Sequence, residues 1–214
     1  RAPQVVDREG RDVLPLKPTF VTGKFGNALR FDGSAGAGAI IAGMGPVFGS
    51  SSPGWTISLW FMELAPAKGS AFLLDIRDSF GWETYNGASG TGLFTCSNGN
   101  PACDSFTLPT LGVWHNIVWV YDGAYNVGAP MNIYLDGVGV PAATVNNPTP
   151  AVLLNSSIAS MGLGRDIAST PLEPSKFAID RVKVFNVVHT PTTRCTFIIG
   201  GTYSAATGNC TLPP

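Results

Sequence analysis

The chain has 214 residues, of which 44% are hydrophobic and 13% are charged, and its formal net charge is −1. A charged share of about half the usual value excludes a disordered, charge-solvated chain and leaves ample apolar material for a core. The balance of charge also removes the electrostatic basis for binding nucleic acid or an anionic membrane surface. No apolar run approaches the roughly 18 residues that a membrane-spanning helix needs.

Residues 1–18 differ from the rest of the chain, because seven charged residues are concentrated there. The two short apolar groups between them, Val5–Val6 and Val13–Leu16, are too small to form a core. Three prolines in this stretch oppose a helix. We therefore expect an extended N-terminal arm that lies across the domain or reaches to a neighbouring molecule.

Residues 19–190 show short apolar runs separated by turn residues, the pattern of an all-β domain. In one run Ile57, Leu59 and Phe61 alternate with other residues, so one face of that strand should be buried. The run Ile117–Tyr121 is apolar on both faces, which indicates a central strand covered on two sides. The predicted strands are Ala28–Asp32, Ala39–Ala42, Thr56–Met62, Ala71–Arg77, Gly92–Cys96, Trp114–Tyr121, Met131–Leu135, Val138–Thr144, Ile158–Gly164 and Lys176–Phe185.

Two local signals refine this pattern. Asp136-Gly137 between two strands predicts a tight type I′ hairpin turn, which needs positive φ at both positions. A change of apolar phase in the last strand predicts a β-bulge near Asp180–Arg181. No stretch shows a convincing helical period. The pattern of strands and turns therefore predicts two packed antiparallel sheets, a jelly roll, over residues 19–190. A C-terminal tail follows at residues 191–214.

The four cysteines form two couples that are close in sequence, Cys96 with Cys103 and Cys195 with Cys210. Four cysteines allow three pairings, and the two local ones close the shortest loops. We expect both local disulfides, the second of which pins the tail; the alternative is two pairs of free buried thiols. N-glycosylation sequons at Asn155 and Asn209 agree with a secretory route and an extracellular location.

Six phrases occur in an order and spacing that resemble one family. They are FGNALRFDG at residues 25–33, WTISLWF at 55–61, GVWHNIVWVYDG at 112–123, NIYLDG at 132–137, GLGR at 162–165 and IDRVKVFN at 179–186. Together they resemble the laminin-G-like, pentraxin-type domains of the concanavalin A-like lectin/glucanase superfamily, over about residues 20–190. This resemblance implies an all-β, concanavalin A-like sandwich. It leaves function open, because that sandwich hosts lectins, adhesion modules, pentraxins and glycosidases.

The acidic residues do not predict a catalytic site. None of the chain's four glutamates has a second acidic residue two positions later, as in the glycosidases of the superfamily. Asp75 and Asp78 have an odd spacing, so an extended strand sends them to opposite faces. The only imidazoles belong to His115 and His189, and His115 fits a packed or surface histidine better than a general base. We expect a protein that is not an enzyme.

Calcium is the cofactor that the resemblance implies. Many relatives bind a calcium ion through aspartates and backbone carbonyls, and Asp32 and Asp180 match the aspartates of the opening and closing phrases. No further acidic residue follows Asp32 closely, as it does in many relatives. The alternative is that Asp32 caps a turn and Asp180 hydrogen-bonds backbone at the bulge.

A glycan site needs aromatic faces beside amide and carboxylate groups. The loop-like segment Phe80–Gly87 offers such a set, namely Trp82, Glu83, Tyr85 and Asn86; Tyr125 and Asn126 form a smaller second candidate. The alternative is that Trp82 and Tyr85 belong to a strand and pack against the sandwich.

These observations favour a secreted, non-catalytic module that binds glycans or an extracellular protein partner in adhesion or matrix. The second hypothesis is a structural subunit of an extracellular fibre, sheath or coat that self-assembles through its N-terminal arm. An unrecognised glycan-active enzyme ranks third.

Overall fold

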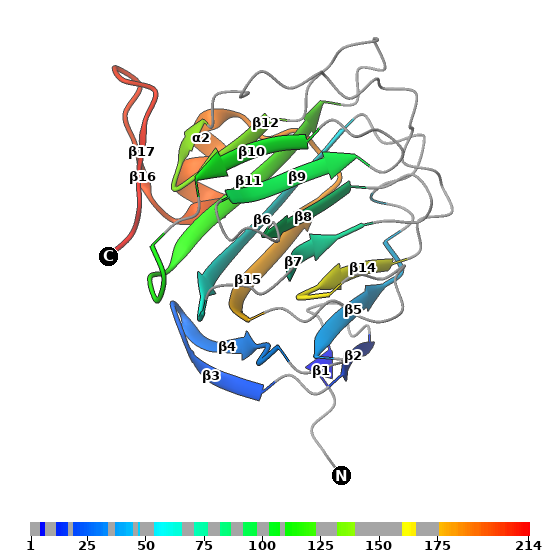
Figure 1. Cartoon of the computed structure of the whole chain (residues 1–214). Helices are drawn as coiled ribbons and strands as arrows, with labels where there is room; N and C mark the ends of the chain where they lie inside the picture. Colours follow the sequence, from blue (N-terminus) through cyan, green and yellow to red (C-terminus); the bar gives the residue numbers. More distant parts are fainter. Residues whose placement is uncertain are drawn as a thin grey trace.

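The computed structural model is a sandwich of two antiparallel β-sheets stacked face to face (Figure 1). It describes residues 5–6, 12–16, 19–33, 37–44, 47, 54–65, 71–76, 82–86, 92–97, 103–107, 110–122, 132–139, 160–165 and 176–214. This architecture confirms the all-β sandwich expected from the sequence.

The described strands form two large sheets. The eight-stranded sheet runs, in spatial order, β1 (Val5–Val6), β2 (Asp12–Leu16), β5 (Gly38–Ala42), β14 (Ser160–Leu163), β7 (Ala71–Asp75), β8 (Trp82–Asn86), β9 (Gly92–Ser97) and β10 (Cys103–Thr107). The seven-stranded sheet runs β13 (Val138–Gly139), β12 (Asn132–Leu135), β11 (His115–Asp122), β6 (Gly54–Glu63), β15 (Phe177–Phe185), β4 (Gly26–Arg30) and β3 (Thr19–Gly23).

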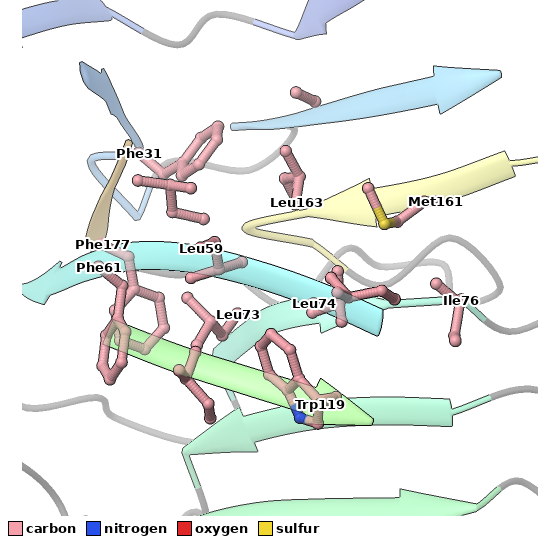
Figure 2. Packing of buried hydrophobic residues seen from close by; sticks show 14 of the residues in the cluster. Phe31, Leu59, Phe61, Leu73, Leu74, Ile76, Trp119, Met161, Leu163 and Phe177 are labelled. Carbon is pink, nitrogen blue, oxygen red and sulfur yellow. The ribbon is translucent and has the colours of Figure 1, made fainter. Parts of the chain in front are cut away.

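The main core lies between the two sheets (Figure 2). Ile57, Leu59 and Phe61 of β6 are fully buried in it, so the predicted burial of that face is confirmed. The other face of β6 is buried as well, since Trp60 packs against the C-terminal segment. The opposing sheet contributes a matching set of apolar side chains, which includes Leu73, Leu74, Ile76, Met161 and Leu163. Side chains from distant parts of the sequence therefore close one continuous apolar layer.

Both local signals in the sequence are confirmed. Asp136 and Gly137 have φ values of 52° and 78°, as a type I′ turn between β12 and β13 requires. The pairing of β15 with β6 shifts register between Asp180 and Lys183, and Arg181 adopts a φ of 47° there. The bulge thus lies at the predicted position.

The structure adds strands that the sequence pattern did not predict. β3, β8 and β10 carry too few alternating apolar residues to stand out. The described parts of the N-terminal arm, β1 and β2, are strands of the chain's own eight-stranded sheet, since β2 pairs with β5 through Val13 and Ile41. These segments therefore lie across the domain, with β1 at the edge of the sheet. The predicted strands around residues 77 and 140–144 extend beyond the described residues.

The C-terminal segment contains a short helical stretch that the sequence pattern did not predict. A short helix, α2 (Pro191–Thr193), continues into a π-helical turn at Arg194–Ile199. Pro191 is favourable at a helix start, and Gly200, with a φ of 86°, ends the turn. A six-residue element of this kind has no helical period long enough to detect in sequence.

The C-terminal segment covers the outer face of the seven-stranded sheet. After the π-helical turn the chain forms the hairpin β16 (Thr202–Tyr203) and β17 (Cys210–Thr211), seen beside α2 in Figure 1. Cys195 and Cys210 form a disulfide across it, so the predicted pairing is confirmed. Their side chains pack with Trp60, Val118 and Ile199 in a second apolar cluster. Among the described residues, no helix is long and apolar enough to span a membrane.

Candidate functional site

The outer face of the eight-stranded sheet brings two acidic positions together. Leu74 of β7 lies in the core, so the next residue, Asp75, belongs to the opposite, outer face. Asp75 is the direct register partner of Glu83 on β8. Directly opposed residues have Cβ atoms about 4.5–5.5 Å apart. Sequence reasoning missed this pair because the two carboxylates come from different strands, and only the register of β7 with β8 joins them.

The acidic pair is part of a longer row across the outer face. Glu83 is in turn the register partner of Cys96, which is the partner of Cys103 on β10. The backbone thus places the two cysteines directly opposite each other. Their disulfide stays a prediction.

A second row on the same face is aromatic. Tyr85 lies two residues along β8 from Glu83, and its register partners are Phe72 on β7 and Phe94 on β9. Residues two apart on a strand share a face, about 7 Å from each other. An aromatic row beside an acidic position suits a sugar, since the ring faces stack on apolar groups and the hydroxyls donate to carboxylates.

The four predicted glycan-binding residues lie at alternating positions of one strand, and their role in glycan binding stays a prediction. They lie in β8, a strand paired on both sides, and not in a loop. Thr84 is the register partner of the core residue Leu74, so Trp82 and Asn86 occupy core-side positions, whereas Glu83 and Tyr85 occupy outer positions. The second candidate, Tyr125 with Asn126, lies outside the described residues, as does Asp78.

The structure does not bring the two predicted calcium ligands together. Asp180 is buried, and its carboxylate accepts a hydrogen bond from the backbone N–H of Phe25 at 2.8 Å, beside the β3–β4 turn. Asp32 is exposed and follows the other end of β4. The five residues of β4, which lie between the two sites, span about 13 Å, whereas calcium ligands lie 2.3–2.6 Å from the ion. One ion therefore cannot bind both; calcium binding elsewhere stays a prediction.

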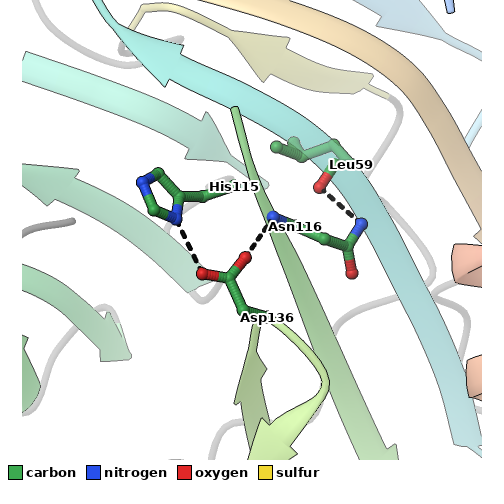
Figure 3. Close-up of polar contacts among 4 residues, drawn as sticks. All are labelled: Leu59, His115, Asn116 and Asp136. Carbon is green, nitrogen blue, oxygen red and sulfur yellow. Dashed lines mark hydrogen bonds and ion pairs between the residues drawn. The ribbon is translucent and has the colours of Figure 1, made fainter. Parts of the chain in front are cut away.

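His115 belongs to a small polar cluster at the end of β11 (Figure 3). Its Nδ1 lies 2.7 Å from Oδ2 of Asp136, whose Oδ1 accepts the backbone N–H of Asn116 at 2.9 Å. The Asn116 amide in turn donates to the carbonyl of Leu59 at 3.1 Å. The cluster fastens the β12–β13 turn to β11 and β6, so His115 acts here as a packed residue that orients a turn.

A cavity lies between the seven-stranded sheet and the C-terminal segment, and we call it the C-terminal cavity. It holds about 60 Å³ of space open to water-sized groups. Its polar lining comes from Tyr134, Arg194, Tyr203 and Asn209, and the Cys195–Cys210 disulfide forms part of its wall. Asn209, one of the two sequon asparagines, is exposed at this site; Asn155 lies outside the described residues.

His189 next to this segment gives the protein a predicted pH response. Burial and the nearby positive charge of Arg194 lower the pKa of His189. As pH falls below about 6.5, the unfolded chain therefore takes up a proton before the folded chain does, and stability declines until the folded pKa is passed. Urea unfolding of the wild type and His189→Gln between about pH 7.5 and pH 5 tests this. The free energy of unfolding of the variant should fall less with decreasing pH than that of the wild type. An equal dependence on pH in both proteins would contradict the prediction.

The sequence match to known families decides the identity of the fold. A laminin G family model, described as the concanavalin A-like lectin/glucanases superfamily, matches residues 33–193. This chain belongs to that superfamily. The resemblance drawn from the sequence is therefore confirmed, and the matched region ends just before the π-helical turn at Arg194. A search of curated protein sequences found no match to this chain.

Solved structures share the fold at low sequence identity. Domain 4 of AbnA, an extracellular GH43 arabinanase from Geobacillus stearothermophilus solved with arabinotriose, has a TM-score of 0.61 and 19% identity, over 82% of this chain and 78% of that chain. Trypanosoma rangeli sialidase has a TM-score of 0.63 and 14% identity, but the match covers 30% of its chain. The binding domain of Paraclostridial Mosquitocidal Protein 1 has a TM-score of 0.62 and 11% identity, with 49% of that chain covered.

Proposed function

We propose that this superfamily member is a non-catalytic, extracellular module that binds a glycan on the outer face of its eight-stranded sheet. The observation that carries this proposal is the aromatic row of Phe72, Tyr85 and Phe94 beside the acidic position Glu83. The arabinanase domain solved with arabinotriose supports it, because that domain shares the fold over most of its length. The Cys195–Cys210 disulfide supports an oxidising, extracellular setting.

Burial argues against a catalytic use of the acidic pair. A retaining glycosidase needs two carboxyl groups that both reach the sugar, about 5 Å apart. Asp75 is 0% exposed, so its carboxylate is shielded from a ligand on the surface. Glu83 would then act alone, as an acceptor for sugar hydroxyls. Assembly through the N-terminal arm has weaker support, because β2 already pairs with β5 of the same chain.

The test is glycan binding by variants of the outer face. Arabinotriose and a panel of other oligosaccharides are titrated into the wild type, Tyr85→Ala and Glu83→Gln by isothermal calorimetry. Loss of an aromatic platform or of a hydroxyl acceptor should weaken binding about 10- to 100-fold, with little change in melting temperature. Each titration is repeated with calcium and with a chelator, which tests the calcium hypothesis in the same experiment.

Two further variants separate binding from folding. Phe197→Ala removes an aromatic ring that is 64% exposed on the C-terminal segment, and it should leave glycan affinity unchanged. Trp82→Ala, at a core-side position, should instead lower the melting temperature. The proposal fails if no glycan binds the wild type, or if Tyr85→Ala and Glu83→Gln bind as well as Phe197→Ala does.

A further inference from the structure

The C-terminal cavity contains a buried positive charge without a matching negative one. Arg194 is only 8% exposed. Among the described residues no carboxylate pairs with it, and its guanidinium instead stacks on Tyr134, 4.0 Å from the ring centre. Burial lowers the pKa of Arg194, which reflects the cost of holding this charge away from water. A buried cation is normally paired with an anion or fully hydrogen-bonded.

The guanidinium keeps donors free for a ligand. A guanidinium has five N–H groups, and one nitrogen, Nη1, donates to the carbonyl of His189 at 2.7 Å. None of the Arg194 nitrogens is among the described buried polar atoms that lack a partner. The remaining guanidinium nitrogens are therefore not fully buried, and Arg194 lines the C-terminal cavity.

The neighbouring groups complete a polar site of defined size. Tyr203 and Asn209 also line the cavity, and their side chains carry a hydroxyl and an amide that can donate hydrogen bonds. Tyr134 packs against the guanidinium. The cavity of about 60 Å³ is several times the space that one water needs, yet it is well below the 150 Å³ of a cavity that holds benzene. A carboxylate fits this volume, whereas a whole sugar ring does not.

We propose that the C-terminal cavity binds a carboxylate group, which pairs with the guanidinium of Arg194 and accepts hydrogen bonds from Tyr203 and Asn209. The carboxylate can come from a free small acid or from an acidic substituent whose bulk stays outside the cavity. Arginine presents donors in a fork that matches the two oxygens of a carboxylate. This site lies on the face opposite the proposed glycan surface, so either proposal can fail alone.

The experiment measures thermal stability and heat of binding of the full chain with sodium acetate against sodium chloride, at pH 7 and equal ionic strength. At about five times the dissociation constant, acetate should raise the melting temperature by about 2–4 °C over chloride. Sodium glucuronate forms a second arm. Tighter binding of glucuronate than of acetate identifies a carboxylate on a larger molecule, and the reverse order identifies a free small acid.

Variants assign the effect to the cavity. Arg194→Gln should abolish the acetate response, and Tyr203→Phe, which keeps the ring, should weaken binding about fivefold through loss of a hydroxyl. Tyr203→Phe keeps the test decisive if Arg194→Gln does not fold. Arg181→Gln is the matched control, because Arg181 also stacks on an aromatic ring, 3.7 Å from the centre of Phe25, but is exposed on the bulge.

Three results overturn the proposal. The first is a wild type that responds to acetate and glucuronate no more than to chloride. The second is an acetate response that Arg194→Gln or Tyr203→Phe retains in full. The third is a response that Arg181→Gln removes as completely as the cavity variants do.

Discussion

Phe61→Ala is expected to lower the free energy of unfolding by about 3–5 kcal/mol, the usual cost of truncating a buried Phe. Phe61 is fully buried in the main core, where its ring lies edge-on to Phe177 at 6.2 Å and tilted to His115 at 6.1 Å. Removing it leaves a cavity where the two sheets meet and loses both ring contacts. Urea unfolding followed by tryptophan fluorescence measures the change.

Two companion variants make this result specific to the core. Phe197→Ala removes the same group from an exposed position and should change stability by no more than about 0.5 kcal/mol. Phe61→Leu keeps most of the volume and should cost less than Phe61→Ala. If Phe61→Ala and Phe197→Ala had similar small effects, the burial of β6 between the sheets would be wrong.

Removal of the Cys195–Cys210 disulfide is expected to cost about 3 kcal/mol. The bond closes a loop with a sequence separation of 15 residues, and in the chain-entropy model it limits the freedom of the unfolded chain by that amount. The double variant Cys195→Ala with Cys210→Ala should therefore melt about 6–12 °C lower, measured by calorimetry. A melting temperature equal to that of the wild type would contradict the prediction.

The reductant response of the same double variant reports on the other two cysteines. With Cys195 and Cys210 removed, any further fall in melting temperature on reduction must come from Cys96 and Cys103. The backbone places that pair in direct register on β9 and β10. If the melting temperature of the double variant does not change on reduction, Cys96 and Cys103 are not bonded to each other.

The fold could be predicted where its signals are local. The alternation of Ile57, Leu59 and Phe61 indicates a buried face of one strand within a few residues. Asp136-Gly137 indicates a turn with positive φ angles. The phase change near Asp180 records a bulge in the same way. Each of these signals lies within a single strand or turn, so it can be read without knowledge of the partner strand.

The candidate site could not be predicted, because it depends on register between strands. Asp75 and Glu83 become neighbours only when β7 pairs with β8, and no spacing along the chain encodes that pairing. The same nonlocal register separates Asp32 from Asp180 at the two ends of β4. The segment Trp82–Asn86 lies between two glycines in the sequence and lacks alternating apolar residues, yet pairing on both sides makes it a strand.

The contacts of Cys195 lead to a prediction of how the C-terminal segment unfolds locally. Its carbonyl accepts the N–H groups of both Gly200 and Gly201, at 3.0 and 2.8 Å, while its sulfur is bonded to Cys210. Gly137 lets the β12–β13 turn approach Cys210, since a side chain at Gly137 would collide with it. The disulfide, the hydrogen bonds that end the π-helical turn and the approach of the β12–β13 turn thus all involve Cys195 or Cys210. Residues 191–214 should therefore exchange their amide hydrogens as a single cooperative unit, separate from the sandwich beneath.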